Sequence, residues 1–141
     1  GHKEVVKLLL EKGANVHATN ECGNTPLHLA SIHGHNKVAE LLLEKGADIE
    51  ATDSFGNTPL HSVAMNGHVK MVRLLLEKGA NIEATDNDGN TPLHTFAGNG
   101  RVKMVRLLLE KGANIEATDN DGNTPLHRST IGVVQLLLDK G

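Results

Sequence analysis

Histidine is the residue through which this sequence could most readily do chemistry. Nine histidines occur among 141 residues, and imidazole both binds metal ions and exchanges protons near neutral pH. Four of them end copies of the tetrapeptide Thr-Pro-Leu-His that recur every 33 residues, at His28, His61, His94 and His127. Successive packed helices lie about 8–10 Å apart, whereas a zinc–nitrogen bond measures about 2.0–2.1 Å, so such a series cannot share one ion.

These four histidines are instead interpreted as structural groups. We expect them to be buried and hydrogen-bonded to the Thr of their own tetrapeptide and to the neighbouring turn. If they are neutral in the folded protein, folding lowers their pKa, and stability is lost as the pH falls through the pKa region of the unfolded chain. His33 and His35 flank Gly34 and could in principle chelate a metal, but the simpler interpretation is that both are solvated.

Three other patterns suggest chemistry but lack an essential part. The string Asp86-Asn87-Asp88-Gly89-Asn90 resembles the start of a calcium loop, yet an EF-hand needs Gly at position 6 and Glu at position 12. Counted from Asp86, Gly89 is at position 4 and Ala97 at position 12. Cys22 is the only cysteine, so no internal disulfide can form, and no base is placed beside it. The glycines form no phosphate-binding motif, and we predict no catalytic residue, cofactor or metal.

The elements that carry these residues form a repeated unit of two helices and a turn. In one unit, Thr58 can cap a helix whose first position is Pro59, and Gly67 can end that helix in the left-handed conformation. A second helix follows, with apolar residues at helical spacing, and ends at Gly79. The stretch 80–90 is rich in Asn, Asp and Gly, which favour turns.

A second segment, Leu-Leu-Leu-Glu-Lys-Gly, has the same 33-residue period and begins at Leu8, Leu41, Leu74 and Leu107. Together with Thr-Pro-Leu-His and the Asp-Asn-Asp-Gly-Asn turn, this period resembles the ankyrin repeat over nearly the whole chain. The resemblance implies an all-α solenoid of stacked antiparallel helix pairs with projecting β-turn fingers, in which neighbours complete one another's core. We expect a single ankyrin-repeat domain over 1–141, with a partial repeat at 1–19, full repeats at 20–52, 53–85 and 86–118, and a shortened repeat at 119–141.

The sequence departs from this pattern at both ends and at one core position. The chain begins in mid-unit, which leaves Val5 and Leu8 without their usual cover and suggests a fragment of a longer array. The last repeat is four residues short. We expect shortened helices there, joined at Gly132, and the loosest packing in the chain. Phe96 stands where other repeats carry a smaller side chain, and the nearby Gly98 could provide room.

Composition limits the classes of partner. The chain is 38% hydrophobic and 22% charged, with a formal net charge of −3, which gives no general attraction to nucleic acid. It has no Trp or Tyr and two Phe, so it lacks the aromatic surface on which bases stack. Its longest apolar runs are triplets, too short to cross a bilayer. We therefore expect no nucleic acid, no membrane insertion, a monomeric state and a cytoplasmic location.

Charge is segregated between turns and helices. The fingers, defined as 14–24, 47–57, 80–90 and 113–123, hold ten acidic residues and no Lys or Arg, a net charge of −10 against +7 for the remainder. Turn formation and the helix dipole explain part of this difference. A functional explanation is that the row of fingers attracts a basic surface on a partner protein.

The resemblance implies that partners touch the fingertips and the inner face of each first helix. The matching tip positions are Glu21, Cys22, Ser54, Phe55, Asn87, Asp88, Asn120 and Asp121, and the helix positions are Ile32, His33, Met65, Asn66 and Asn99. The favoured function is thus a protein–protein interaction module rather than an enzyme. Two alternatives stay open. One is a structural spacer of a larger repeat protein, which the identity of 69–94 with 102–127 favours; the other is an engineered ankyrin scaffold.

Overall fold

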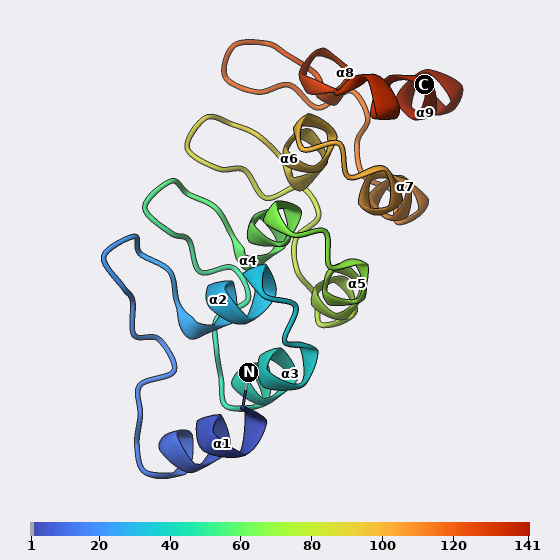
Figure 1. The fold of residues 1–141 in the computed structure, drawn as a ribbon. Coiled ribbons are helices and arrows are strands. Elements are labelled where there is room, and N and C mark those ends of the chain that lie inside the picture. Colours follow the sequence, from blue (N-terminus) through green and yellow to red (C-terminus); the bar gives the residue numbers. More distant parts are fainter. Residues whose placement is uncertain (1) are drawn as a thin grey trace.

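The computed structural model describes residues 2–141, which form nine α-helices and one 3₁₀ helix and contain no β-strand. Alternate helices lie in two rows (Figure 1). The inner row, beside the fingers, consists of α2 (Pro26–Ile32), α4 (Pro59–Ser62) with the 3₁₀ helix η1 (Val63–Met65), α6 (Pro92–Gly98) and α8 (Pro125–Arg128). The outer row consists of α1 (Lys3–Glu11), α3 (Asn36–Glu44), α5 (Val69–Glu77), α7 (Val102–Glu110) and α9 (Ile131–Lys140).

From α2 onward, each helix packs against its partner in the pair and against the corresponding helices of the neighbouring pairs, whereas α1 packs against α3. The leucine triplets explain this arrangement, because their first two members face inward. In α5, for example, Leu74 and Leu75 are buried while Leu76 is only partly covered, and α3 and α7 repeat the pattern. Burying one leucine contributes about 1.5–3 kcal/mol, and these side chains are covered only when the next pair is in place. The expected stacked, all-α architecture is confirmed.

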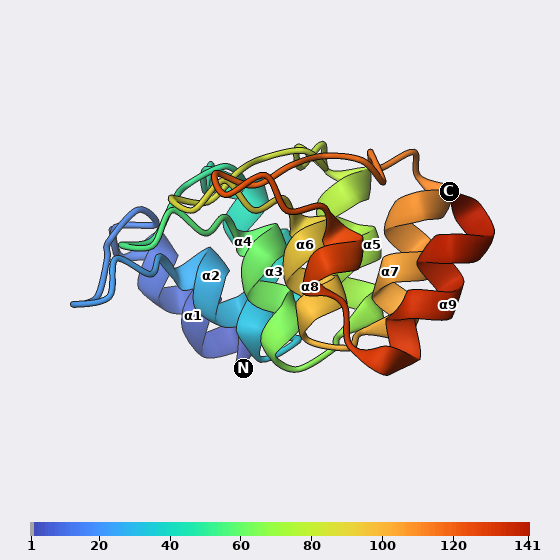
Figure 2. The same ribbon diagram turned by 90° about the horizontal axis from the view of Figure 1, so that it is seen from above.

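The fingers leave the helix rows on one side and run close together (Figures 1 and 2). Each is a tight turn built on an Asp or Asn side chain. Asp86 Oδ1 accepts hydrogen bonds from the amides of Asp88 at 2.9 Å and Asn90 at 2.8 Å, and Gly89 closes the turn at a φ of +80°. Asn20 holds the first finger in the same way, without a charge. A carboxylate is therefore not required for the turn itself.

Neighbouring fingers are joined at their tips by backbone hydrogen bonds. The amide of Asn87 donates to the carbonyl oxygen of Phe55, and the amide of Asn120 donates to that of Asp88, both at 3.0 Å. The side-chain amide of Asn120 also donates to the carbonyl oxygen of Asn87 at 3.1 Å. The fingers approach so closely that a Cβ on Gly89 would lie 2.8 Å from the backbone nitrogen of Asn120. The tips thus form one continuous row rather than independent loops.

The two ends of the stack pack less tightly than its middle. None of the side chains of α1 is buried, and Val5 and Leu8 are exposed, as expected. At the other end, α8 buries only Pro125. The central helix α6, by comparison, buries five residues, including the fully buried Phe96. A Cβ on Gly98 would make an ordinary contact, 3.5 Å from the nearest carbonyl oxygen, so its role in making room for Phe96 stays a prediction.

The expectation for the last repeat is partly wrong. Only α8 is shortened, to four residues, whereas α9 has ten. The two helices meet at Ser129 and Thr130, and Gly132 lies within the first turn of α9. The physical reason is that the amide of Thr130 donates to the carbonyl oxygen of Ala97 at 3.3 Å, which ties the extended linker to α6. The four-residue deletion is therefore absorbed by the inner helix.

A matched pair of glycine substitutions tests the row of fingers. Gly89 and Gly122 share a φ of +80° and the same turn, but no atom lies within 4 Å of a Cβ on Gly122. An alanine at either position costs about 1–2 kcal/mol for the left-handed backbone. We expect Gly89→Ala to lose about 1–3 kcal/mol more because it also collides with the next finger. Urea unfolding of both variants measures the difference, and equal losses would show that the fingers do not support one another.

Amide hydrogen exchange tests the unequal packing of the stack. The amides of 129–135 should exchange faster than those of α5 and α6, because few buried side chains hold α8 and the linker, and local opening there costs less free energy. Exchange monitored by mass spectrometry on the whole chain gives the comparison directly. Equal protection of the two regions would contradict the prediction.

Candidate functional site

A groove lies between the tips of the fingers and the inner helices. It has a volume of about 360 Å³ and is lined by fingers and helices of three successive units. Five of the thirteen residues predicted from the sequence meet in its wall: Cys22, Ile32, Phe55, Met65 and Asn99. They come together because the fingers and the inner helices of successive units lie side by side in the stack.

Two large apolar side chains stand out of this groove. Phe55, on the second fingertip, is 68% exposed, and Met65, at the end of η1, is 62% exposed. Ile32 is half-buried between them and the first unit, and the Cys22 thiol is exposed. An aromatic ring and a flexible thioether on a surface are well suited to pack against an incoming apolar side chain.

Several other predicted residues are already engaged within the chain. The side-chain amide of Asn66 donates to the carbonyl oxygen of Ile32 at 2.7 Å, and that of Asn99 donates to the carbonyl oxygen of Thr95 at 2.8 Å. Asn87 donates to the carbonyl oxygen of Ser54 at 3.2 Å. The remaining tip residues, Glu21, Asp88, Asn120 and Asp121, are exposed at the outer edge of the row.

His33 lies away from the groove. It lines a separate apolar hollow of about 240 Å³ together with Val6, Leu29 and His35. The His33 and His35 rings are stacked, with centroids 5.9 Å apart. Within residues 2–141, no group of three or more His, Cys, Asp or Glu side chains is arranged to hold a metal ion. His33 directly follows α2 as its C-terminal cap, and the sequence could not show that it lines this hollow rather than the groove.

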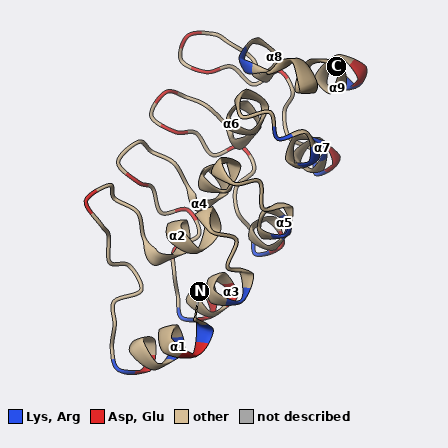
Figure 3. Cartoon of the chain, in the orientation of Figure 1, with Lys and Arg blue, Asp and Glu red and all other residues tan. Residues whose placement is uncertain are grey.

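The fingers carry acidic residues and no Lys or Arg, whereas the helices carry basic residues together with some acids, as Figure 3 shows. Two of the acids are tied to the next finger. Glu50 accepts a hydrogen bond from the amide of Asn81, and Glu83 accepts one from the amide of Asn114, each at 2.7 Å. These two acids therefore have a structural role between repeats, apart from the turns themselves. They join repeats while keeping the negative charge at the fingers.

The histidines of Thr-Pro-Leu-His form a second set of links between repeats. The Nδ1 atom of His61 accepts a hydrogen bond from the amide of Thr58 at 3.2 Å, so the proton of a neutral ring is on Nε2. That Nε2 group donates to the carbonyl oxygen of Asn90 at 3.0 Å, in the following finger. His28 and His94 repeat the arrangement and are buried. The structural interpretation of these three residues is confirmed.

His127 is the exception among the four. It completes the capping box of Thr124, but it is exposed and its Nε2 has no hydrogen bond to a following finger within residues 2–141. The prediction that all four histidines are buried and bonded to a neighbouring turn is therefore wrong at this position. The sequence motif specifies the cap, whereas the second bond requires a further finger beside it.

Two ankyrin-repeat models match the chain. A model of three ankyrin repeats covers residues 1–86, and a model of many ankyrin repeats covers 64–109 and 96–138. The chain belongs to the ankyrin-repeat family. Ankyrin repeats are generally protein–protein interaction modules and are typically non-enzymatic. Comparison with curated proteins finds no match to this chain. None of the helices in residues 2–141 is long and apolar enough to cross a membrane.

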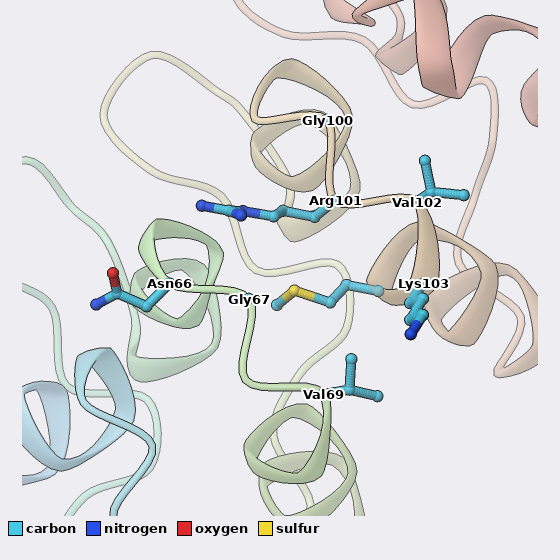
Figure 4. Close-up of a pocket in the computed structure, with 8 residues that line it drawn as sticks. Asn66, Gly67, Val69, Gly100, Arg101, Val102 and Lys103 are labelled. Atoms are coloured by element: carbon cyan, nitrogen blue, oxygen red, sulfur yellow. The ribbon is translucent and has the colours of Figure 1, made fainter.

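This ankyrin-repeat chain also has a pocket on the side away from the fingers. It lies between two neighbouring helix–helix connections, the one that leads into α5 and the one that leads into α7. The pocket measures about 310 Å³ and is lined by residues that include Gly67, Val69, Arg101 and Lys103 (Figure 4). The Arg101 guanidinium extends across it and donates from Nε to the carbonyl oxygen of Ala64 at 2.7 Å. Its Nη2 group donates to the carbonyl oxygen of Met65. Arg101 thus satisfies the end of η1 and has a structural role.

One charged pair was missed by the sequence analysis. Arg128 of α8 donates from Nε at 2.8 Å, and also from Nη2, to Oδ2 of Asp119 in the last finger. The Asp119 side chain is fully buried beneath it. Burial raises the pKa of Asp119, but the hydrogen bonds from the Asn123 amide and from Arg128 outweigh it and lower the pKa to about 2. The available signal was that Arg128 stands in register with Leu29, Ser62 and Thr95, none of which is charged.

The buried histidines predict a loss of stability in mild acid. Burial lowers the pKa of His28 and His61 below the usual 6.5, although hydrogen bonds to the Asn57 and Asn90 carbonyl groups oppose the shift. The unfolded chain therefore binds protons first, so their contribution is complete above pH 6.5 and is lost as the pH falls toward the folded-state pKa.

The urea concentration at the midpoint of unfolding should consequently be lower at pH 5 than at pH 7. A His127→Gln variant provides the control, because His127 is exposed and the same fall should remain after its removal. A midpoint that stays constant over this range would refute the role given to His28 and His61.

Proposed function

We propose that this chain recognises another protein through the groove and the fingertips. The observation that supports the proposal best is the exposure of Phe55 and Met65 in the wall of one concave site. Large apolar side chains on a monomer surface commonly mark an interaction site when they are grouped. Phe55 and Met65 are the anchors in this proposal, with Cys22, Ile32 and Asn99 forming the rest of the contact.

The partner is proposed to carry a basic surface. The fingers carry a net charge of −10. Five of their ten acids are exposed, and Asp119 alone is buried, where it pairs with Arg128. A cationic partner would be steered toward this row, and the association rate would fall as added salt screens the charges. The outer tip residues Glu21, Asp88 and Asp121 are placed to act at this stage. Ser54, Asn87 and Asn120 contribute mainly by holding the tips in line.

The rest of the functional proposal follows from the family and from the composition. We propose that residues 1–141 act as one domain and as a monomer in the cytoplasm, without catalysis and without a cofactor. His33 and Asn66 have a lesser place in this proposal, because His33 lines another hollow and the Asn66 side chain binds the Ile32 carbonyl oxygen.

A structural spacer is the second candidate. The identity of 69–94 with 102–127 favours it, because a surface that reads one partner has reason to differ from repeat to repeat. The differences that do occur, at Phe55 and Met65, lie in the groove and favour recognition. The two candidates therefore differ in whether the groove itself has a ligand.

A selection from a displayed random-peptide library tests the groove. Peptides selected on the whole chain should bind a Phe55→Ala/Met65→Ala variant at least about tenfold more weakly, because truncating central anchors costs more than 1 kcal/mol each. An Ile131→Ala/Leu138→Ala variant is the matched control, since these apolar side chains are 95% and 57% exposed and lie on α9. Titration calorimetry gives the affinities.

The control variant should bind like the original chain, and the selected peptides should be rich in Lys or Arg and associate more slowly at high salt. Peptides that bind all three proteins equally, or a selection that enriches nothing, would favour the spacer over recognition.

A further inference from the structure

The pair formed by Arg128 and Asp119 shows how a finger of this chain binds a guanidinium group. Asp119 Oδ1 accepts the amides of Asp121 and Asn123 that hold the turn, at 3.0 and 2.9 Å. Its other oxygen, Oδ2, accepts two N–H groups of Arg128 and a longer hydrogen bond, at 3.3 Å, from the Asn123 side-chain amide. One carboxylate therefore holds the turn and binds a guanidinium group at the same time.

The preceding finger carries the same carboxylate without the arginine. Asp86 lies 33 residues before Asp119 in an identical sequence, 69–94 against 102–127. Its Oδ1 accepts the turn amides of Asp88 and Asn90, as in the last finger. The residue in register with Arg128 is Thr95, whose short hydroxyl side chain donates to the carbonyl oxygen of Thr91 at 3.4 Å rather than reaching the finger.

Because Thr95 stands in place of the arginine, the Asp86 carboxylate is more exposed than that of Asp119 and has a pocket beside it. A pocket of about 240 Å³ lies beside Asp86 and is lined also by Asn90, Thr95, Asn99 and Arg128. Asp86 is half-buried, whereas the Asp119 side chain is fully covered by its arginine. Asn90 contacts both carboxylate oxygens of Asp86, at 3.2 and 3.1 Å, and so fixes the carboxylate in the same orientation that Asn123 gives Asp119.

We infer that Asp86 is the receiving site for an arginine side chain of the partner protein, whose guanidinium group takes the place beside Thr95 that Arg128 takes beside Asp119. The inference rests on the proposed function for the statement that the arginine belongs to a protein. The pocket opens on the inner face of the fingers, next to Asn99 at the edge of the apolar groove. A partner segment could thus place an apolar side chain against Phe55 and Met65 and an arginine at Asp86.

The charges around the pocket are compatible with a cation. Arg128 is the one basic side chain in its lining, and it is neutralised by Asp119 and lies 4.0 Å from the carboxylate of Asp121. His94 also lines the pocket, and its Nε2 already binds the carbonyl oxygen of Asn123. Asp53 is the corresponding acid one unit earlier. It lines the apolar groove together with Ser62, the residue in register there, which is buried, whereas Thr95 is half-buried.

Arginine is expected to bind better than lysine. The guanidinium group is planar and can direct two N–H groups at one carboxylate, as Arg128 does, whereas an ammonium group is a strongly hydrated point charge. A neutral side chain of the same shape lacks the charge that strengthens these hydrogen bonds. The site is therefore expected to bind a guanidinium group more tightly than an ammonium group or a neutral group of the same shape.

The test is a titration of the whole ¹⁵N-labelled chain with N-acetyl-arginine amide, followed by NMR. The amides of Asp88 and Asn90 should shift most, because both donate to Asp86, with a dissociation constant on the order of millimolar. N-acetyl-lysine amide should shift them at least about threefold less, and N-acetyl-citrulline amide should leave them unchanged. Arginine and citrulline shifts of equal size would overturn the inference.

Two matched variants locate the site. Asp86→Asn removes the charge but keeps the turn, as Asn20 shows in the first finger, and it should weaken the arginine response at least about tenfold. Glu116→Gln removes an exposed finger charge outside the pocket and should leave the response within about twofold. An unchanged response in Asp86→Asn, or an equal loss in both variants, would mean that the fingers attract cations without a specific site.

A third variant supplies the arginine internally. Thr95→Arg should occupy Asp86 and abolish the response at Asp88 and Asn90, and continued binding of the probe would contradict the proposed geometry. Because these measurements use no partner, they are independent of the peptide selection. Peptides that depend on Phe55 and Met65 would support recognition even if the arginine probe failed at Asp86, and specific binding of the probe would stand even if no such peptide were found.

Discussion

The hydrogen bond from a buried imidazole to the carbonyl oxygen of the following finger is the interaction on which this structure depends. His28, His61 and His94 each cap their own helix through Nδ1 and reach the next repeat through Nε2. A single neutral side chain thus fixes the start of a helix and the position of a finger 29 residues later. Since the ring is buried, either bond left unmade would leave a polar group without a partner, which costs more than the bond gains.

The row of fingers is a consequence of those links. Once each finger is tied to an inner helix, the tips lie close enough for Asn87 and Asn120 to bond to the preceding tip. Glu50 and Glu83 add a bond near the base of the same fingers. The negative charge at the fingers is thereby carried on a supported surface, which lowers the entropy that a partner would have to overcome on binding.

The groove combines this ordered acidic row with an apolar wall. Phe55 and Met65 are the large apolar side chains there that expose most of their surface. The Asp86 pocket adds a directed charge at the edge of the same groove. An apolar anchor and a nearby guanidinium group require different partner chemistry, and together they would discriminate among partners better than the net charge can.

The sequence by itself determined the repeat, the helix starts, the fingertips and the place of Cys22 and Phe55 on them. These features depend on local chemistry, such as Pro59 behind a Thr cap or Gly89 at a positive φ, and a constant period of 33 residues carries them from one repeat to the next. The family followed from the same motifs.

Only the tertiary structure decided which groups of the neighbouring repeats lie beside each residue. It separated His33 from the groove, exposed His127, moved the last helix junction to Ser129 and Thr130, and set Arg128 on Asp119. The physical reason is that a motif specifies bonds within about one helical turn, whereas these outcomes depend on whether a neighbouring repeat presents a carbonyl group, a carboxylate or open solvent at the same height in the stack.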